Sequence, residues 1–211
     1  MDIVVARRGQ VSEADGLLEQ MFRLRARVFC DRLAWDVTVT DGQERDGFDS
    51  LSPDYLLAVT RDRVVIGCVR LLPASGPTML QTVFPFLLSD GVLNAREQSV
   101  ESSRFCVDAD IGREPPTFLH NATLSLFCGI IEWSILHGYT DIVTVTDLRF
   151  ERLLRHARWP MQRLGQPHMI GNVNSIAGRL PADPEVLNRL RPPGYHLCHL
   201  TPTPSSHSDF V

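Results

Sequence analysis

The sequence predicts one α/β domain in which a single mixed sheet carries helices on its faces. Three observations lead to this class: a strand hairpin comes first, later strands alternate with helices, and no linker divides the 211 residues. A composition of 44% hydrophobic and 22% charged residues is typical of a globular chain. We therefore predict a domain at residues 1–200 and a flexible tail at residues 201–211, which is rich in Pro and Ser.

The first half of the chain supplies a strand, a helix and the hairpin. An apolar run at residues 3–6 predicts the first strand, and a helix opens at Ser12, continuing with one apolar arc through residue 29. Residues 55–60 and 64–72 predict two strands joined by a polar turn. Because the second of these is apolar on both faces, we expect it inside the sheet.

The second half alternates strands with helices. The pattern predicts a strand at residues 99–107, a helix at about 117–137 that Gly138 terminates, a strand at 141–146 and a helix at about 147–158. Short strands and a helix at residues 184–190, opened by Pro184, fill the last third. This alternation predicts the helices that cover the sheet.

Composition excludes several classes of protein. The net charge of −4 argues against a nucleic-acid binder. All 21 basic residues are Arg, so a Schiff-base lysine and a lysine-containing phosphate loop are both impossible. Five widely spaced cysteines indicate reduced thiols, and Cys106 is interpreted as a buried thiol rather than a nucleophile.

No membrane span, export signal or metal site is predicted. The apolar stretch at residues 118–136 contains His120 and Glu132, which favours a core helix. His196, Cys198 and His199 lack a nearby fourth ligand. We expect a cytoplasmic protein whose oligomeric state the sequence leaves open.

Two arginines occupy apolar surroundings. Arg25 lies near the middle of the apolar arc of the first helix, and Arg70 ends a strand that is apolar on both faces. A guanidinium cannot escape burial by losing its proton, so each needs an anion or carbonyl partners. The alternative for Arg25 is a stem that covers the core while its head reaches water. The acids of the loop at residues 41–49 are the candidate partners: Asp41, Glu44, Asp46 and Asp49.

Glu101 and Arg104 form a further candidate pair. In a regular strand they would point to opposite faces, so they can cooperate only if a β-bulge shifts the alternation. A partly buried carboxylate could accept a proton from an amine nucleophile, whereas the alternative is a strand-end salt bridge. Arg149, Arg152 and Arg155 recur on one helix, where a solvated face or a docking face for an acidic partner is expected.

Several motifs resemble those of the LuxI-type acyl-homoserine-lactone synthases, the autoinducer synthases. The resemblance spans roughly residues 20–165, with motif spacings kept. The motifs are Arg25-x3-Phe29, Trp35, Asp46-x2-Asp49, Gly67-x2-Arg70-Leu-Leu-Pro73, Gly76-Pro-x-Met-Leu80, Phe84 and Glu101-x-Ser-Arg104-Phe105.

This resemblance implies a fold similar to the GNAT acetyltransferases, an αβα sandwich with a mixed, splayed central sheet. It implies that the amine of S-adenosylmethionine attacks an acyl thioester on acyl carrier protein or coenzyme A, and that the methionine carboxylate then closes the lactone. Methylthioadenosine leaves, and S-adenosylmethionine is a substrate, so no separate cofactor is expected.

The resemblance also implies roles for individual residues. Glu101 is the expected proton acceptor, and Asp46, Asp49, Arg70 and Arg104 organise the catalytic site. The S-adenosylmethionine pocket is expected to contain Arg25, Phe29, Trp35, Phe84 and Ser103. The acyl chain is expected to contact Phe105, Val143, Thr144 and Thr146, and a carrier protein to dock on Arg149, Arg152 and Arg155.

Two other functions stay open from the residues alone. One is a GNAT-type N-acyltransferase acting on another amine, although residues 108–116 lack the pyrophosphate loop of that class. The other is a non-catalytic sensor that binds acyl carrier protein. Release of methylthioadenosine would separate both from a lactone synthase.

Overall fold

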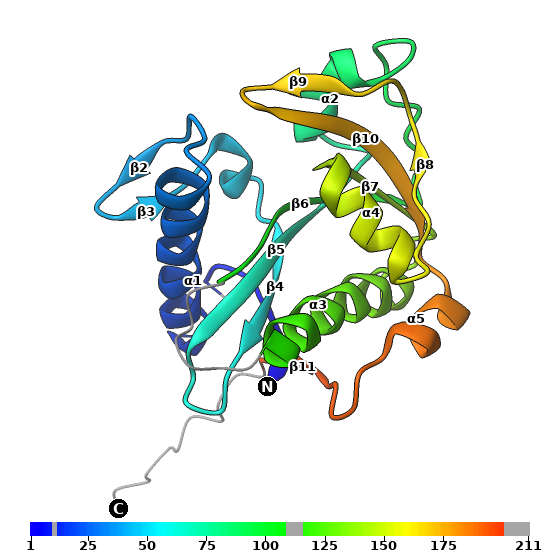
Figure 1. Ribbon diagram of the computed structural model, residues 1–211. Helices are drawn as coiled ribbons and strands as arrows, with labels where there is room; N and C mark the ends of the chain where they lie inside the picture. The colour runs from blue at the N-terminus through cyan, green and yellow to red at the C-terminus, as the bar shows by residue number, and fades with distance from the viewer. Residues whose placement is uncertain (10–11, 109–115, 201–211) are drawn as a thin grey trace, which may run out of the picture.

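Residues 1–9, 12–108 and 116–200 are described by a computed structural model, and within them nine strands form one sheet beside a small hairpin (Figure 1). The predicted tail at residues 201–211 lies outside this range. The strands are β1 (Asp2–Ala6), β2 (Val39–Thr40), β3 (Gln43–Glu44), β4 (Asp54–Val59), β5 (Val65–Pro73), β6 (Ser99–Val107), β7 (Asp141–Asp147), β8 (Gln162–Arg163), β9 (His168–Ile170), β10 (Val173–Pro181) and β11 (Leu197–His199). The α-helices are α1 (Ser12–Arg25), α2 (Met79–Thr82), α3 (Pro116–Leu136), α4 (Leu148–His156) and α5 (Pro184–Leu190).

The sheet is mixed, with the order β11-β1-β4-β5-β6-β7-β10-β8 and β9 paired to β10. β1 and β11 pair in parallel, as do β6 and β7, whereas the other neighbours are antiparallel. The predicted central position of β5 is confirmed, because β4 and β6 flank it.

The sheet opens between β6 and β7. Their parallel ladder runs only from Ser99 to Ser102, paired with Asp141 to Thr144, although both strands continue further. Beyond this point β6 follows β5 while β7 follows β10. The edge of β6 that faces β7 is therefore released from the ladder beyond Ser102.

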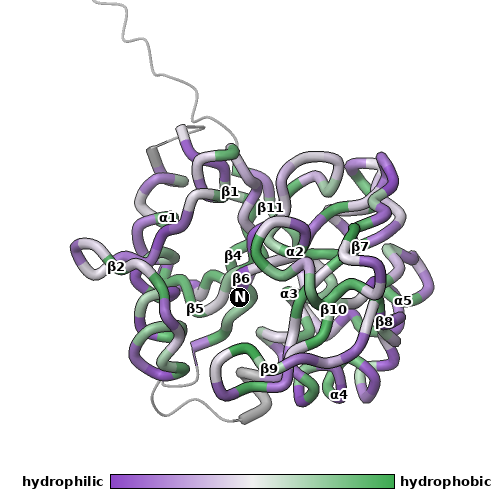
Figure 2. The backbone as a smooth tube through the Cα atoms, turned by 90° about the horizontal axis from the view of Figure 1, so that it is seen from above, coloured by the Kyte–Doolittle hydropathy of each residue, from purple (hydrophilic) through white to green (hydrophobic). Residues whose placement is uncertain are grey.

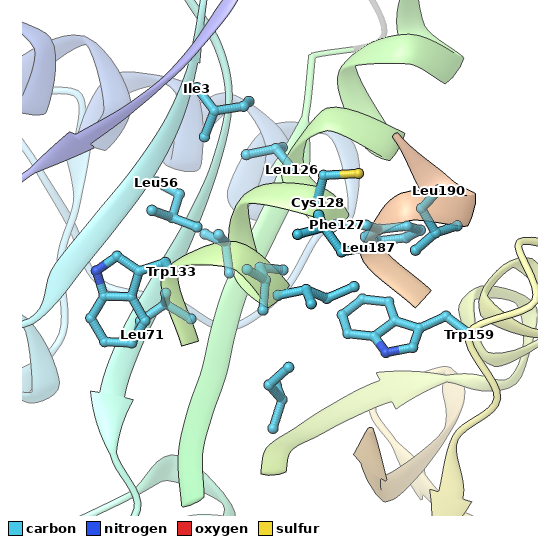
Figure 3. Close-up of a cluster of buried hydrophobic side chains, with 14 of the residues drawn as sticks. Ile3, Leu56, Leu71, Leu126, Phe127, Cys128, Trp133, Trp159, Leu187 and Leu190 are labelled. Carbon is cyan, nitrogen blue, oxygen red and sulfur yellow. The ribbon is translucent and has the colours of Figure 1, made fainter. Parts of the chain in front are cut away.

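Helices cover the two faces of the sheet separately. Figure 1 shows α1 and α3 on opposite sides of β4 and β5. The larger core lies on the α3 face, where Ile3 and Leu56 of the strands belong to one buried cluster with Phe127 of α3 and Leu187 of α5 (Figure 3). Figure 2 shows hydrophobic residues along β4 and β5 in the middle of the molecule, as expected for strands buried on both faces.

Most predicted elements are present, but three local features differ. A π-helix, Ala26–Arg32, continues α1, and the apolar arc did not predict it because Val28 and Phe29 are buried in either winding. The acidic loop at residues 41–49 overlaps the β2–β3 hairpin, which begins at Val39, and a 3-10 helix, Gly47–Ser50. α2 and the 3-10 helix Pro85–Leu87 were not predicted, because each is one turn or less and carries no periodic signal.

Candidate active site

Arg25 is held by two carboxylates at the end of α1. Its Nη1 and Nη2 donate to the two oxygens of Asp49 at 2.8 and 3.0 Å, and its Nε donates to Glu44 Oε2 at 2.5 Å. The side chain is 0% exposed, so the anion-facing interpretation is confirmed over an arginine whose head reaches water. Burial alone would lower the pKa of Arg25, but the two carboxylates outweigh it and raise the pKa.

Arg70 enters the same network from β5. Its Nη1 donates to Asp46 Oδ1 at 2.5 Å and to Asp49 Oδ1 at 2.9 Å, and its Nε donates to Ser103 Oγ at 3.1 Å. Asp49 is thus shared by Arg25 and Arg70, two fully buried cations. The network that the sequence suggested for these residues is present.

The predicted bulge brings Arg104 to the network. Between the pairs Cys68–Cys106 and Arg70–Ser103 the register shifts by one residue, and Arg104 adopts φ +55°. Arg104 Nε then donates to Glu44 Oε1 at 3.2 Å, and its Nη2 lies 2.8 Å from Asp46 Oδ2. Because a non-glycine residue in this conformation is strained, surrounding contacts must hold it there.

The acidic loop folds around its own capping interactions. Asp46 accepts from the backbone N–H of Phe48, and Asp49 accepts from the backbone N–H of Asp46, which forms a capping box. Burial opposes ionisation of Asp49, but Arg25 and Arg70 outweigh it and hold its pKa well below the usual range. Burial and the Asp49 charge raise the pKa of Tyr55, whose hydroxyl donates to Asp49 at 2.7 Å.

Glu101 lies beside the network but binds backbone rather than arginine. Its oxygens accept from the N–H groups of Met79 at 2.9 Å and Leu80 at 2.8 Å, at the start of α2. It is 2% exposed, and burial raises the pKa of its carboxyl against these two hydrogen bonds. Glu101 and Arg104 meet at Met79, because Arg104 Nη1 donates to the Met79 sulfur at 3.3 Å.

Aromatic rings border the network on the side of α1. Phe29 and Trp35 stack with centroids 5.0 Å apart and planes 6° from parallel, and Trp35 is 44% exposed. The Arg104 guanidinium lies 5.6 Å from the Phe29 centroid. Phe84 lies apart from them, in the apolar cluster that includes Leu80.

The predicted acyl-pocket residues divide between the two faces of the sheet. Phe105 lies on the α3 face, where its ring contacts Phe127 and Phe150 at 5.5 and 5.0 Å. Val143 of β7 is fully buried on the other face, in the cluster with Leu80. Successive residues of a strand alternate between the faces of the sheet. Thr144 and Thr146 therefore share the face opposite to Val143, and the Thr144 hydroxyl donates to Ser102 O at 2.8 Å.

A cavity of about 370 Å³ opens on the α3 face. Phe127 and Leu124 of α3, Leu153 of α4 and Leu190 of α5 line it, together with the polar residues His120, His156, Arg158 and Arg189. Phe127 also contacts Phe105, which lies on the part of β6 beyond its ladder with β7. The cavity can hold an apolar chain.

The remaining predicted residues lie on the surface or in the core. Arg149, Arg152 and Arg155 are exposed on α4. Cys106 lies 3.5 Å from Cys68, sulfur to sulfur, and that neighbour and burial hold its pKa well above the usual range, which suits an inert thiol.

Glu44, one of the four loop acids named as candidate partners of the arginines, bridges Arg25 and Arg104. Two further residues at the site were given no role from the sequence. Tyr55 and Met79 contact the network through a hydroxyl and a thioether. The only signal for Met79 was its place in Gly76-Pro-x-Met-Leu80, and Tyr55 was read as one of many strand residues.

Within the described part of the chain, no three His, Cys, Asp or Glu side chains gather as metal ligands would. No helix in residues 1–9, 12–108 and 116–200 is long and apolar enough to cross a bilayer.

The chain has clear relatives among known proteins. The sequence model of the family described as autoinducer synthase matches residues 10–190. An acyl-homoserine-lactone synthase from Agrobacterium fabrum is 55% identical over 197 residues, covering 93% of each chain.

Solved structures show the same fold. The AHL synthase LasI has a TM-score of 0.79 at 31% identity, covering 89% of this chain and 93% of LasI. BjaI, a CoA-dependent acyl-homoserine lactone synthase solved with SAM and isopentyl-CoA, has a TM-score of 0.81 at 24% identity, covering 95% of this chain and 94% of its own. The predicted fold class is confirmed.

Proposed function

This chain belongs to the autoinducer synthase family of acyltransferases, and from that premise we propose the reaction that its site performs. The substrates are S-adenosylmethionine and an acyl thioester, and the products are an acyl-homoserine lactone, methylthioadenosine and the free thiol carrier. No separate cofactor takes part. The reaction runs in the cytoplasm, where both substrates are made.

The observation that carries this proposal is the closed charge network beside the opening of the sheet. Three arginines and three carboxylates hold one another there, and Glu101 adds a fourth carboxylate nearby. With Glu101 ionised, the group carries one net negative charge. That charge suits S-adenosylmethionine, which carries one net positive charge because of its sulfonium.

In the first step the amine nitrogen attacks the thioester carbonyl carbon, and the carbon–sulfur bond breaks. Glu101, directly or through one water, accepts the amine proton, which then neutralises the leaving thiolate. A carboxyl whose pKa is raised by burial is suited to this task. Backbone N–H groups of β6 beyond Ser102, released from the ladder with β7, stabilise the oxyanion.

In the second step the methionine carboxylate attacks the methylene carbon beside the sulfonium. The new carbon–oxygen bond closes the lactone, and the carbon–sulfur bond to methylthioadenosine breaks. Because the sulfonium is already a good leaving group, the site needs chiefly to hold the two reacting groups in line. Arg25, Arg70 and Arg104 supply the fixed charges for this, and Phe29 and Trp35 offer aromatic faces to the adenine or the sulfonium.

The acyl chain passes through the opening between β6 and β7, along Phe105, toward the cavity under α3, α4 and α5. Thr144 borders this path, but its hydroxyl proton is directed at Ser102 O. A 3-oxo group would therefore compete for that proton. We propose acyl carrier protein as the donor, because the exposed arginines of α4 offer a basic surface to an acidic carrier.

Mass spectrometry of the purified protein tests the reaction. The protein is given S-adenosylmethionine with a panel of acyl carrier protein and CoA thioesters of different lengths. We expect a lactone together with an equimolar amount of methylthioadenosine. Acyl transfer without methylthioadenosine would instead indicate an N-acyltransferase, and binding without any product would indicate a sensor.

A further inference from the structure

Two arginines of the network share one unusual acceptor. Arg70 Nη2 donates to the Met79 sulfur at 3.0 Å, and Arg104 Nη1 donates to the same atom at 3.3 Å. The other two nitrogens of Arg70 donate to Ser103 and to carboxylates. The other two nitrogens of Arg104 contact carboxylates. A thioether is a weak acceptor, so these two N–H groups are the least strongly bound cationic donors in the network, and they converge on one point.

The sulfur is fixed at that point. Met79 is 8% exposed, and its backbone N–H donates to Glu101 at 2.9 Å. The Thr78 hydroxyl caps the same turn by accepting from the N–H of Gln81 at 3.0 Å. The Met79 side chain thus begins from an anchored backbone.

Carboxylates hold the other end of Arg104. Its Nη2 lies 2.8 Å from the buried Asp46 Oδ2 and 3.2 Å from Glu44 Oε1. Because charged contacts to carboxylates are far stronger than a bond to a thioether, they fix that end of the guanidinium. The Met79 sulfur contacts the remaining nitrogen, Nη1.

We propose that Met79 is a positioning residue. By accepting one N–H from Arg70 Nη2 and one from Arg104 Nη1, it keeps the second N–H of each nitrogen aimed at the place where the methionine carboxylate of S-adenosylmethionine binds. This inference rests on the proposed function. A carboxylate has the charge and the two oxygens to receive one N–H from each arginine. Methylthioadenosine lacks that carboxylate, so its binding does not depend on Met79.

Equilibrium binding of two ligands tests the proposal. Met79→Leu removes the sulfur acceptor while keeping an apolar side chain and the backbone N–H. We expect the Kd for S-adenosylmethionine to rise by about tenfold, with the Kd for methylthioadenosine unchanged. The matched control is Met21→Leu, the same change at a fully buried methionine in the apolar core of α1, which should alter neither constant.

A second variant separates positioning from folding. Met79→Gln restores an acceptor oxygen at similar reach, so we expect it to recover most of the affinity for S-adenosylmethionine. Equal loss of both ligands in Met79→Leu would overturn the proposal, because it would indicate a damaged fold. Unchanged affinity for both ligands would overturn it as well. Wild-type protein that binds neither ligand would instead refute the proposed function, and the inference with it.

Discussion

Asp49 accepts four side-chain hydrogen bonds, and three of them come from guanidiniums. Its oxygens accept from Arg25 twice, from Arg70 and from Tyr55. Asp49→Asn removes one of the two carboxylates that each of two buried guanidiniums binds, leaving Glu44 for Arg25 and Asp46 for Arg70, so we expect the free energy of unfolding to fall by about 3 kcal/mol. Urea unfolding measures this loss. Asp62→Asn, in the exposed turn between β4 and β5, is the matched control and should change stability by less than about 0.5 kcal/mol.

Asp49 and Glu101 also give opposite dependences of stability on pH. The pKa of Asp49 is lowered on folding, so its contribution is present above the ordinary carboxyl pKa and is lost only as pH falls through the lower folded value. The pKa of Glu101 is raised, so its contribution is present below the unfolded value and is lost as pH rises through the folded value. Asp49→Asn should therefore flatten the acid limb of a stability curve, which unfolding at several pH values measures.

Glu101→Gln removes the proposed proton acceptor while keeping the shape of the side chain. We expect kcat to fall by about 10²-fold or more, a much larger change than the loss of one negative charge causes in the Kd for S-adenosylmethionine. Glu97→Gln, an exposed position just before β6, is the control. The acid limb of the wild-type kcat profile should lie above the ordinary glutamate pKa and vanish in the variant. Unchanged turnover would remove Glu101 from the chemistry and leave it only its bonds to α2.

At the scale of elements, the sequence predicted what depends on long patterns. The strand β5 and the helix α3 have long apolar runs that identify them, and charges inside apolar faces marked Arg25 and Arg70. A bulge was named as the condition under which Glu101 and Arg104 could cooperate, and the structure has one at Arg104. The π-helix was missed because Val28 and Phe29 are buried in either winding, and α2 was missed because it is too short to show hydrophobic periodicity.

What the sequence could not supply is the choice of partner across the fold. Nothing local indicated that Glu101 would bind the N–H groups of α2 rather than an arginine, or that Glu44 would bridge Arg25 and Arg104. The family resemblance grouped Val143 with Thr144 as acyl-chain contacts, yet alternation along β7 places them on opposite faces of the sheet. Such contacts depend on where loops place residues that are distant in sequence, and the hydrophobic periodicity of the sequence carries no information about this.

The cavity between α3, α4 and α5 predicts a change in acyl preference. Leu124→Trp fills part of the cavity, so we expect the kcat/KM ratio of long to short acyl donors to fall by about fourfold per methylene excluded. Leu136→Trp makes the same change on the same helix at a position that is 63% exposed, and should leave the ratio unchanged. A ratio unaffected by Leu124→Trp would place the acyl chain elsewhere.

At the scale of the whole molecule, the opening between β6 and β7 joins two chemically different faces. The charge network lies on the α1 face, and the apolar cavity lies on the α3 face. The bulge at Arg104 places Arg104 toward the first and Phe105 toward the second. Adjacent residues of β6 thus face the proposed sites of the two substrates. We therefore expect a displacement of β6 to alter the binding of both substrates.

The surface charge of the molecule gives the last prediction. The chain carries a net charge of −4, yet Arg152 and Arg155 are exposed on α4, beside the helix wall of the cavity. Arg152→Glu with Arg155→Glu should raise KM for an acyl carrier protein donor by about tenfold at low salt, an effect that shrinks as ionic strength rises. Steady-state kinetics at two salt concentrations measures it. Arg61→Glu, in the β4–β5 turn, tests whether negative charge anywhere repels the carrier, and an equal rise there would refute docking on α4. A short acyl-CoA donor distinguishes docking from damage to the site, because its KM should respond less to the α4 changes than that of the carrier.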